Sequence, residues 1–354
     1  MGALHQFVRT LERSAVGNHV LELQRLAVEE VGVASTVFAE AVHPSLAGRA
    51  RPLADYGSAV PAAADDVLVY HHAVGAHTAD VVATRPERLV VDHHNVTPPL
   101  FNEGWAPDVA YECAWGVRQL RLLAPRAELG VGDSSFNAGE LAAAGCRTTA
   151  AAPILVDLSP FAGTGDVEPP GPTEWLFVGR MAPNKCQHDV VTAFAAYRRL
   201  YEPEARLCLV GGGGGRYGDA VAAHAEALGV GDAVRLLGSV SFEELVARYR
   251  AASVLVCLSE HEGYCVPLLE AMAAGVPVVA YASTAVPETL AGAGVLLDTK
   301  EPLRVAAAVA QVRGDDALRR SLRKAGAARA AELDLAPTRR RWAALLETHG
   351  LVGP

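Results

Sequence analysis

The 354-residue chain contains no Cys-x-x-Cys pair, no Asp-x-Asp motif and no apolar run of the roughly 18 to 20 residues that cross a bilayer. Its six cysteines stand singly, several of them in apolar stretches such as RLCLV, which predicts buried free thiols. Without Asp-x-Asp, a metal-bridged diphosphate site of the kind built on that motif has no obvious ligands. The N-terminal MGALHQFVRTLERS is too polar for a signal peptide, so we expect a cytoplasmic protein.

Excess positive charge and the common nucleotide motifs are also missing. A formal charge of -9 and a pI near 5.7 argue against a nucleic-acid binder. The stretch GRMAPNK lacks the glycine before lysine and the Ser/Thr after it that a P-loop needs. The glycine run 211–215 offers a G-x-G-x-x-G spacing, but the next strand, AVRLLG, carries no acidic residue to hold a ribose. Nicotinamide binding is disfavoured, and a tight strand-to-helix turn explains the run at least as well.

The length predicts two domains, since 354 residues exceed the usual size of one. Short β-rich runs alternate with amphipathic helix-length segments, first from ALHQFV to RLVVDHHN and again from TEWLFVGR to GVLLD, which indicates two α/β domains with parallel sheets. We expect the domains at residues 1–160 and 161–335, with a turn-rich linker over 161–172. A last helix over 336–350 is expected to pack back on the first domain.

Basic residues are unevenly chosen, because only three of the 31 are lysines: Lys185, Lys300 and Lys324. Lys185 and Arg180 stand five apart in a loop between a predicted strand and helix, where open α/β sheets place ligands. An ammonium beside a guanidinium suits a diphosphate. Two solvated surface cations are the alternative.

Two carboxylates flank a hydrophobic segment in EHEGYCVPLLEAMAAG (260–275). The preceding SVLVCLS predicts a buried strand, Pro267 is suited to the start of a helix and Gly275 to its end. Glu262 therefore falls in the loop and Glu270 early in the helix, near amides that can receive a phosphate or sugar oxygen. For Glu270, a favourable acid near a helix N-terminus is an equal alternative.

Five histidines gather early in the chain, at positions 71, 72, 77, 93 and 94. Neighbouring histidines in a strand point to opposite faces and lack the usual spacing of metal ligands, so no metal site is predicted. Near the C-terminus, the basic run 339–341 before Trp342 fits either weak peripheral membrane contact or a solvated helix face. Three basic residues fall short of the usual polybasic cluster, which favours the solvated face.

In this order and spacing, FVGRMAPNK, LVGGGGG and EHEGYCVPLLEAMAAGVPVVA resemble the C-terminal domain of the retaining glycosyltransferases of family 4. The resemblance covers most of residues 174–300, and the two glutamates match that family's Glu-x7-Glu signature. The stretches LVYHH and DHHNVTPPLF resemble a bacterial branch with a YHN-type strand end. The resemblance implies the GT-B architecture, in which two Rossmann-like parallel-sheet domains face a central cleft.

The resemblance also implies roles for individual residues. Arg180 and Lys185, beside Gly179, would bind the donor diphosphate, Glu262 would contact the donor sugar and Glu270 would hold the ribose. The backbone near the sugar would come from Gly263, Tyr264, Cys265 and Val266. His94 would face the reacting sugar, and Gly17 and Asn18 would belong to a first loop that approaches donor and acceptor. Cys265 departs from the family, which commonly has glycine there.

A family member of this kind would move a sugar from a UDP- or GDP-sugar to an acceptor hydroxyl, with no metal and no cofactor beyond the nucleotide-sugar donor. The first domain would bind the acceptor, a glycan, a lipid-linked glycan or a small molecule. Two other classes stay open. A GT-B sugar-nucleotide 2-epimerase would need further acid/base residues, and a non-catalytic partner subunit would be expected to have lost Glu262 or the Arg180 and Lys185 pair.

Overall fold

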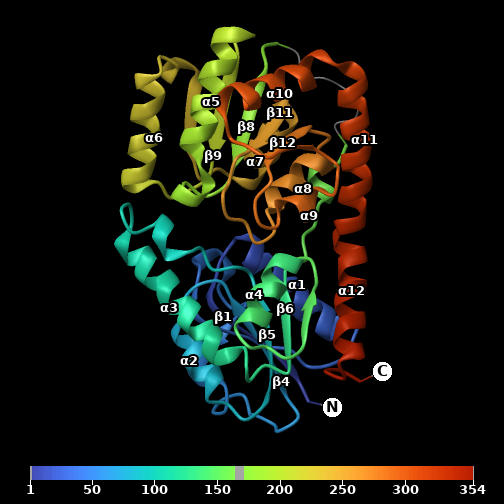
Figure 1. Ribbon diagram of the computed structural model, residues 1–354. Helices are drawn as coiled ribbons and strands as arrows, with labels where there is room; N and C mark the ends of the chain where they lie inside the picture. The colour runs from blue at the N-terminus through green and yellow to red at the C-terminus, as the bar shows by residue number, and fades with distance from the viewer. Residues whose placement is uncertain (1, 164–170, 354) are drawn as a thin grey trace. The chain divides into compact units, whose positions relative to one another are not determined.

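The computed structural model describes residues 2–163 and 171–353 and divides the chain into two compact α/β units (Figure 1). Unit 1 comprises Met1–Pro99, Asp108–Val156 and Leu333–Pro354, and unit 2 comprises Leu100–Pro107 and Asp157–Glu332. Part of the predicted linker, residues 164–170, lies outside the described residues. Both units are parallel-sheet α/β structures, as the alternation of apolar patterns predicts.

Unit 1 is built on a seven-stranded parallel sheet with the order β3-β2-β1-β4-β5-β6-β7. Its strands are β1 (Leu4–Leu11), β2 (Val37–Val42), β3 (Arg51–Pro52), β4 (Val67–His72), β5 (Arg88–His93), β6 (Leu129–Gly132) and β7 (Thr149–Ala151). Its helices are α1 (Ala15–Glu29), α2 (His77–Ala83), α3 (Pro107–Leu123), α4 (Ser135–Ala143) and α12 (Leu335–Thr348), with the 3-10 segments η1 (Pro44–Leu46) and η2 (Leu53–Asp55). The C-terminal helix α12 thus belongs to unit 1.

Unit 2 is built on a six-stranded parallel sheet with the order β10-β9-β8-β11-β12-β13. Its strands are β8 (Glu174–Val178), β9 (Arg206–Val210), β10 (Val234–Gly238), β11 (Val254–Cys257), β12 (Val278–Tyr281) and β13 (Val295–Leu297). Its helices are α5 (Gln187–Leu200), α6 (Gly215–Ala227), α7 (Phe242–Ala251), α8 (Val266–Ala273), α9 (Val286–Leu290), α10 (Pro302–Gly314) and α11 (Asp316–Leu333). The 3-10 segments are η3 (Pro99–Phe101), η4 (Ser159–Phe161), η5 (Pro183–Lys185) and η6 (Gly231–Ala233).

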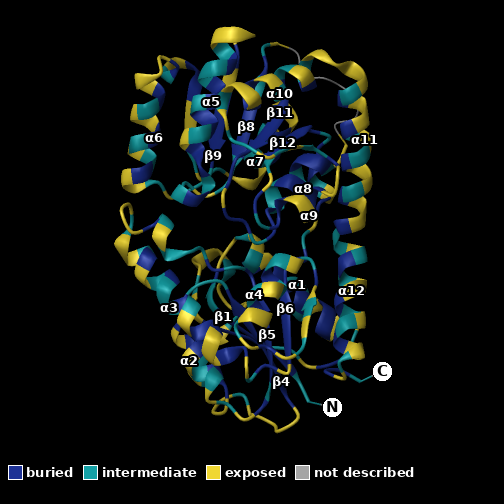
Figure 2. Cartoon of the chain, in the orientation of Figure 1, coloured by how far each residue is buried: buried dark blue, intermediate teal, exposed yellow. Residues whose placement is uncertain are grey.

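The central strands are apolar on both faces because helices cover both faces of each sheet, as parallel sheets require. Figure 2 shows buried strands and helices whose exposed residues face outward. In β4, Val67 and Val69 pack on the side of α1 and α12, whereas Leu68 and Tyr70 pack on the opposite side. The same alternation carries on to the strand's last two residues, His71 and His72.

Each sheet has a point where the strand order reverses, and such a point is where open α/β sheets hold their ligands. In unit 1 it lies between β1 and β4, and in unit 2 between β8 and β11. A ligand is therefore expected at the loops that follow these four strands. All six cysteines are free and buried, as predicted. Among the described residues, no helix is both long and apolar enough to cross a membrane.

Candidate functional site

Two loops at the reversal point of unit 2 are joined by hydrogen bonds. The loop after β8 carries Arg180 and ends in η5 with Lys185, and the loop after β11 carries Glu262. Asn184 links them, because its side-chain amide donates to the His261 carbonyl at 3.1 Å and its own carbonyl accepts from the Glu260 N–H at 2.9 Å. The loops are therefore held in register by backbone groups as well as by side chains.

Lys185 and Glu262 form an ion pair, with Nζ and Oε2 2.6 Å apart. Their side chains are 21% and 7% exposed. Burial alone would lower the pKa of the Lys185 ammonium, but the Glu262 carboxylate beside it raises that pKa above its ordinary value. Lys185 therefore carries its positive charge at neutral pH, at the place where the fold predicts a ligand.

Helix α8 starts directly after this loop. Its N-cap is Cys265, in the left-handed region at φ +67°, Pro267 lies in its first turn and Gly275 follows its end at φ +72°. These limits confirm the helix predicted between Pro267 and Gly275. Glu270 accepts a 2.6 Å hydrogen bond from the Tyr249 hydroxyl, and burial raises the pKa of Glu270 to about 7 although this bond lowers it.

The glycine run after β9 packs against the loop that carries Arg180. A Cβ on Gly211, whose φ is +146°, would lie 1.9 Å from the Gly179 carbonyl oxygen, and a Cβ on Gly213 would lie 3.3 Å from Arg180 Cγ. The Met181 N–H donates to the Gly212 carbonyl at 2.9 Å. These contacts favour the tight-turn interpretation of the run. Arg180 itself is exposed.

Two residues of unit 1 that were predicted to lie in a loop lie in a helix instead. Gly17 and Asn18 belong to the first turn of α1, not to the loop before it. The Gly17 N–H donates to the side chain of the N-cap Ser14, and a Cβ on Gly17 would lie 1.9 Å from the Glu12 carbonyl oxygen. Gly17 is therefore required for the close entry of the chain into α1, a constraint that the sequence motif does not display.

His94 is enclosed within unit 1. Its Nδ1 lies 3.0 Å from Asp133, its Nε2 lies 3.0 Å from His71 Nδ1, and its side chain is 1% exposed. Burial alone would lower the pKa of His94, but Asp133 and Asp92 raise it to about 9, whereas burial lowers the pKa of His71 to about 4. The predicted contact of His94 with a reacting sugar stays a prediction.

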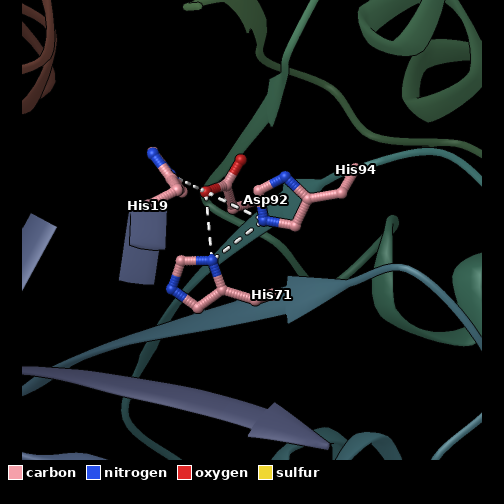
Figure 3. Close-up of side chains that lie close together, drawn as sticks. All are labelled: His19, His71, Asp92 and His94. Atoms are coloured by element: carbon pink, nitrogen blue, oxygen red, sulfur yellow. Dashed lines mark hydrogen bonds and ion pairs between the residues drawn. The ribbon is translucent and has the colours of Figure 1, made fainter. Parts of the chain in front are cut away.

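The histidines come together across strands, which the sequence argument on spacing did not consider. Four side chains gather on one side of the sheet (Figure 3): His19 of α1, His71 of β4, Asp92 of β5 and His94 directly after β5. Their nitrogen and oxygen atoms that could bind a metal all lie within 4.8 Å of one another. His72 and His93 pair on the other side, at 3.1 Å. Neighbouring histidines do face opposite sides of the sheet, as predicted. Strands β4 and β5 pair His71 with Asp92 and His72 with His93, and this register brings side chains of different strands together. The absence of a metal site stays a prediction.

Two doubly wound parallel units, the second with a cation and a carboxylate at its reversal point, define the GT-B class of fold. More particularly, residues 166–329 match the family model described as "Glycosyl transferases group 1". The matched residues lie in unit 2, and the match supports the class of enzyme predicted from the sequence.

Similar proteins agree with this assignment. A Mycobacterium tuberculosis protein named GDP-mannose-dependent alpha-(1-6)-phosphatidylinositol monomannoside mannosyltransferase is 35% identical over 144 residues, which are 38% of this chain and 37% of that protein. The chain thus matches little more than a third of that relative's length. Among solved structures, sucrose-phosphate synthase from Thermosynechococcus elongatus has a TM-score of 0.78 at 17% identity, with 98% of this chain and 99% of that chain covered.

A second solved structure, Anabaena HepE in complex with UDP-glucose, has a TM-score of 0.76 at 17% identity, with 98% of this chain and 99% of that chain covered. These structural similarities confirm the predicted GT-B fold. The donor, the acceptor, the stereochemistry and the roles of the single residues stay predictions.

Proposed function

We propose that the chain is a retaining glycosyltransferase of family 4 that moves a sugar from a UDP- or GDP-sugar to an acceptor hydroxyl, with no metal ion at the diphosphate. The Lys185–Glu262 pair at the reversal point of unit 2 carries the proposal, since it fixes a partly buried cation and a buried hydrogen-bond acceptor where the fold predicts a ligand. The name of the mycobacterial relative and the ligand of HepE support the two donor types.

The chemistry required is stabilisation of negative charge on the departing nucleoside diphosphate while positive charge grows on the sugar ring. Lys185 and Arg180 supply fixed cations and the start of α8 supplies backbone amides, so the leaving group is neutralised by groups already in place. Glu262 accepts hydrogen bonds from the donor sugar and Glu270 from the ribose. The acceptor hydroxyl attacks the anomeric carbon of the donor sugar on the face from which the diphosphate leaves. The bond from that carbon to the diphosphate oxygen breaks as the new glycosidic bond forms, and the leaving phosphate oxygen takes the acceptor proton.

The test begins with donor binding to the full chain. UDP, GDP and their sugars are titrated by thermal shift and calorimetry, with and without Mg²⁺. A ligand at 100 times its Kd raises the free energy of unfolding by about 2.7 kcal/mol. Lys185→Ala removes a charged hydrogen bond worth about 1.5–3 kcal/mol, so we expect affinity for every nucleoside diphosphate to fall by roughly 10- to 100-fold.

Lys324→Ala is the matched control, because Lys324 is an exposed lysine of α11 in the same unit. Unchanged affinity in Lys185→Ala, or an equal loss in Lys324→Ala, contradicts the proposed donor site. Product analysis by NMR then separates transfer from epimerisation. Release of UDP or GDP must depend on an acceptor, and the anomeric coupling in the product must match that in the donor.

A further inference from the structure

The buried cluster of unit 1 has a proton arrangement that its hydrogen bonds determine. His19 Nδ1 accepts the Leu155 N–H at 2.9 Å, so the ring's proton is on Nε2, which donates to Asp92 Oδ2 at 2.8 Å. His71 Nε2 lies 2.8 Å from the Gln6 side-chain oxygen and must donate to it. His71 Nδ1 is therefore left with a lone pair that faces the centre of the cluster.

His94 also presents one ring nitrogen to the cluster, and without a metal ion a second proton on that nitrogen would donate to His71 Nδ1 at 3.0 Å. His94 Nδ1 donates to the Asp133 carboxylate at 3.0 Å, which turns its Nε2 inward. His71 Nδ1, His94 Nε2 and Asp92 Oδ2 then form a triangle with sides of 3.0, 3.2 and 3.5 Å. Three electron-rich atoms at these distances repel one another unless a positive charge lies between them.

The triangle has the dimensions of a transition-metal site. Ligands held 2.0–2.1 Å from Zn²⁺ in tetrahedral geometry lie about 3.3 Å from one another. Each ligand also has the outer partner that a metal site needs: Asp133 accepts from His94, Gln6 accepts from His71 and His19 donates to Asp92. His19 is excluded as a ligand, because its Nδ1 already accepts an N–H and ligation through Nε2 would leave the ring without a proton.

The buried negative charge of the cluster and an unpaired carboxylate oxygen also favour a metal ion. Asp92 is fully buried, and its Oδ1 accepts no hydrogen bond from any residue that the structure describes. Asp133 is also buried, and within the described part of the chain neither carboxylate pairs with a lysine or arginine. One divalent ion would balance both carboxylates, whereas a single proton would leave one negative charge buried.

We propose that unit 1 binds one divalent transition-metal ion of the Zn²⁺ type through His71 Nδ1, His94 Nε2 and Asp92, with Asp92 Oδ1 available as a further donor atom. Imidazole ligands favour such an ion over Mg²⁺ or Ca²⁺, which prefer oxygen. A pocket of about 330 Å³ at the reversal point of unit 1 is lined by Arg9, Ser14 and His71 among others, so His71 is the ligand that borders it. This inference does not depend on the proposed donor site in unit 2.

The experiment strips the full-length chain with a chelator and titrates Zn²⁺ alone by calorimetry, with metal content measured after dialysis. We expect one tightly bound ion per chain, and Co²⁺ in its place should give visible absorption. His71→Gln and Asp92→Asn should each weaken binding by 100-fold or more. Asp133→Asn, which changes only the outer partner, should weaken it by roughly 10- to 100-fold.

Two controls separate this site from others. His72→Gln alters a buried histidine of the same strand that faces the other side of the sheet and should leave Zn²⁺ affinity unchanged. Cys257→Ser tests a second group of potential ligands, Cys257, Glu262 and Cys265, and should also have no effect. Circular dichroism of the metal-free variants checks folding, and Asp133→Asn keeps the test decisive if Asp92→Asn does not fold. A wild-type chain that takes up no Zn²⁺, or binding that His71→Gln and Asp133→Asn leave intact, shows that the triangle holds a proton and overturns the proposal.

Discussion

At the scale of single residues, the Lys185–Glu262 pair should be strongly coupled. Loss of one partner leaves the other charge poorly solvated, which costs about 3–5 kcal/mol in fully buried pairs. Since Lys185 keeps 21% exposure, we expect about 2–3 kcal/mol for Lys185→Met or Glu262→Gln. The double variant should lose at least 1 kcal/mol less, roughly, than the two losses added together. Urea unfolding of the four proteins measures this, and strictly additive losses would show that the pair contributes nothing.

Glu270 gives unit 2 a defined pH dependence. Burial raises its pKa from 4.5 to about 7, so the folded state binds more protons than the unfolded state between these values. The free energy of unfolding therefore falls as pH rises from about 4.5 to 7, and the loss, on the order of 3 kcal/mol, is complete about one unit above the folded-state pKa. Glu270→Gln does not titrate, so its stability relative to wild type should increase between pH 5 and 8 in urea titrations. A constant difference across that range would contradict a raised pKa.

At the scale of elements, the glycines after β9 are required for two different reasons: close packing against another loop, or a left-handed backbone conformation alone. Gly211→Ala would place a Cβ 1.9 Å from a backbone oxygen, whereas Gly215→Ala meets only an unfavourable φ of +44° with nothing within 4 Å. We expect Gly211→Ala to cost more than 2 kcal/mol, roughly, and to weaken nucleoside diphosphate binding through the displaced Arg180 loop. Gly215→Ala should cost about 1 kcal/mol. Equal thermal stability of the two variants would contradict the packing described for Gly211.

Elements with strong local signals were predictable from the sequence. Pro267 and Gly275 fix the ends of α8 through their own backbone preferences, and apolar strands bounded by turns reveal both parallel sheets. The pairing of Lys185 with Glu262 was not predictable, because it depends on β8 and β11 being neighbours in the sheet. Along the chain, 75 residues and two strands lie between Val178 at the end of β8 and Val254 at the start of β11.

The histidine cluster shows the same limit more sharply. Period-two alternation places His71 and His72 on opposite faces, as the sequence argument states, but it does not say which residue of β5 lies beside each of them. Which side chains meet depends on the register of the two strands, which places His71 opposite Asp92. It also depends on α1, which contributes His19 from a distant part of the chain. A search for alternate residues at the ends of predicted neighbouring strands would have found His71, Asp92 and His94 together.

At the scale of the whole molecule, the two units differ in how many separate segments of the chain form them. Unit 2 is almost one continuous segment, Asp157–Glu332, whereas unit 1 needs the last residues of the chain as well as the first. Helix α12 supplies Trp342 and Leu346 to the core beside α1, and Arg339 pairs with carboxylates of α1, such as Glu29 at 3.1 Å. The C-terminal segment is therefore a structural part of unit 1, and its basic run is partly neutralised there.

Stability of the two units should therefore respond separately to changes in α12. Trp342 is fully buried and donates from Nε1 to the Pro153 carbonyl at 2.8 Å, so Trp342→Ala removes a large core side chain and leaves that carbonyl without its partner. We expect a loss of about 3–5 kcal/mol confined to unit 1. Arg341→Ala, at the exposed neighbouring position, should change stability by less than roughly 0.5 kcal/mol. Calorimetry with and without a bound nucleoside diphosphate can tell the units apart, since the ligand should raise only the transition of unit 2. If Trp342→Ala lowers the ligand-sensitive transition as much as the other, the units do not unfold independently and the division of the chain between them is wrong.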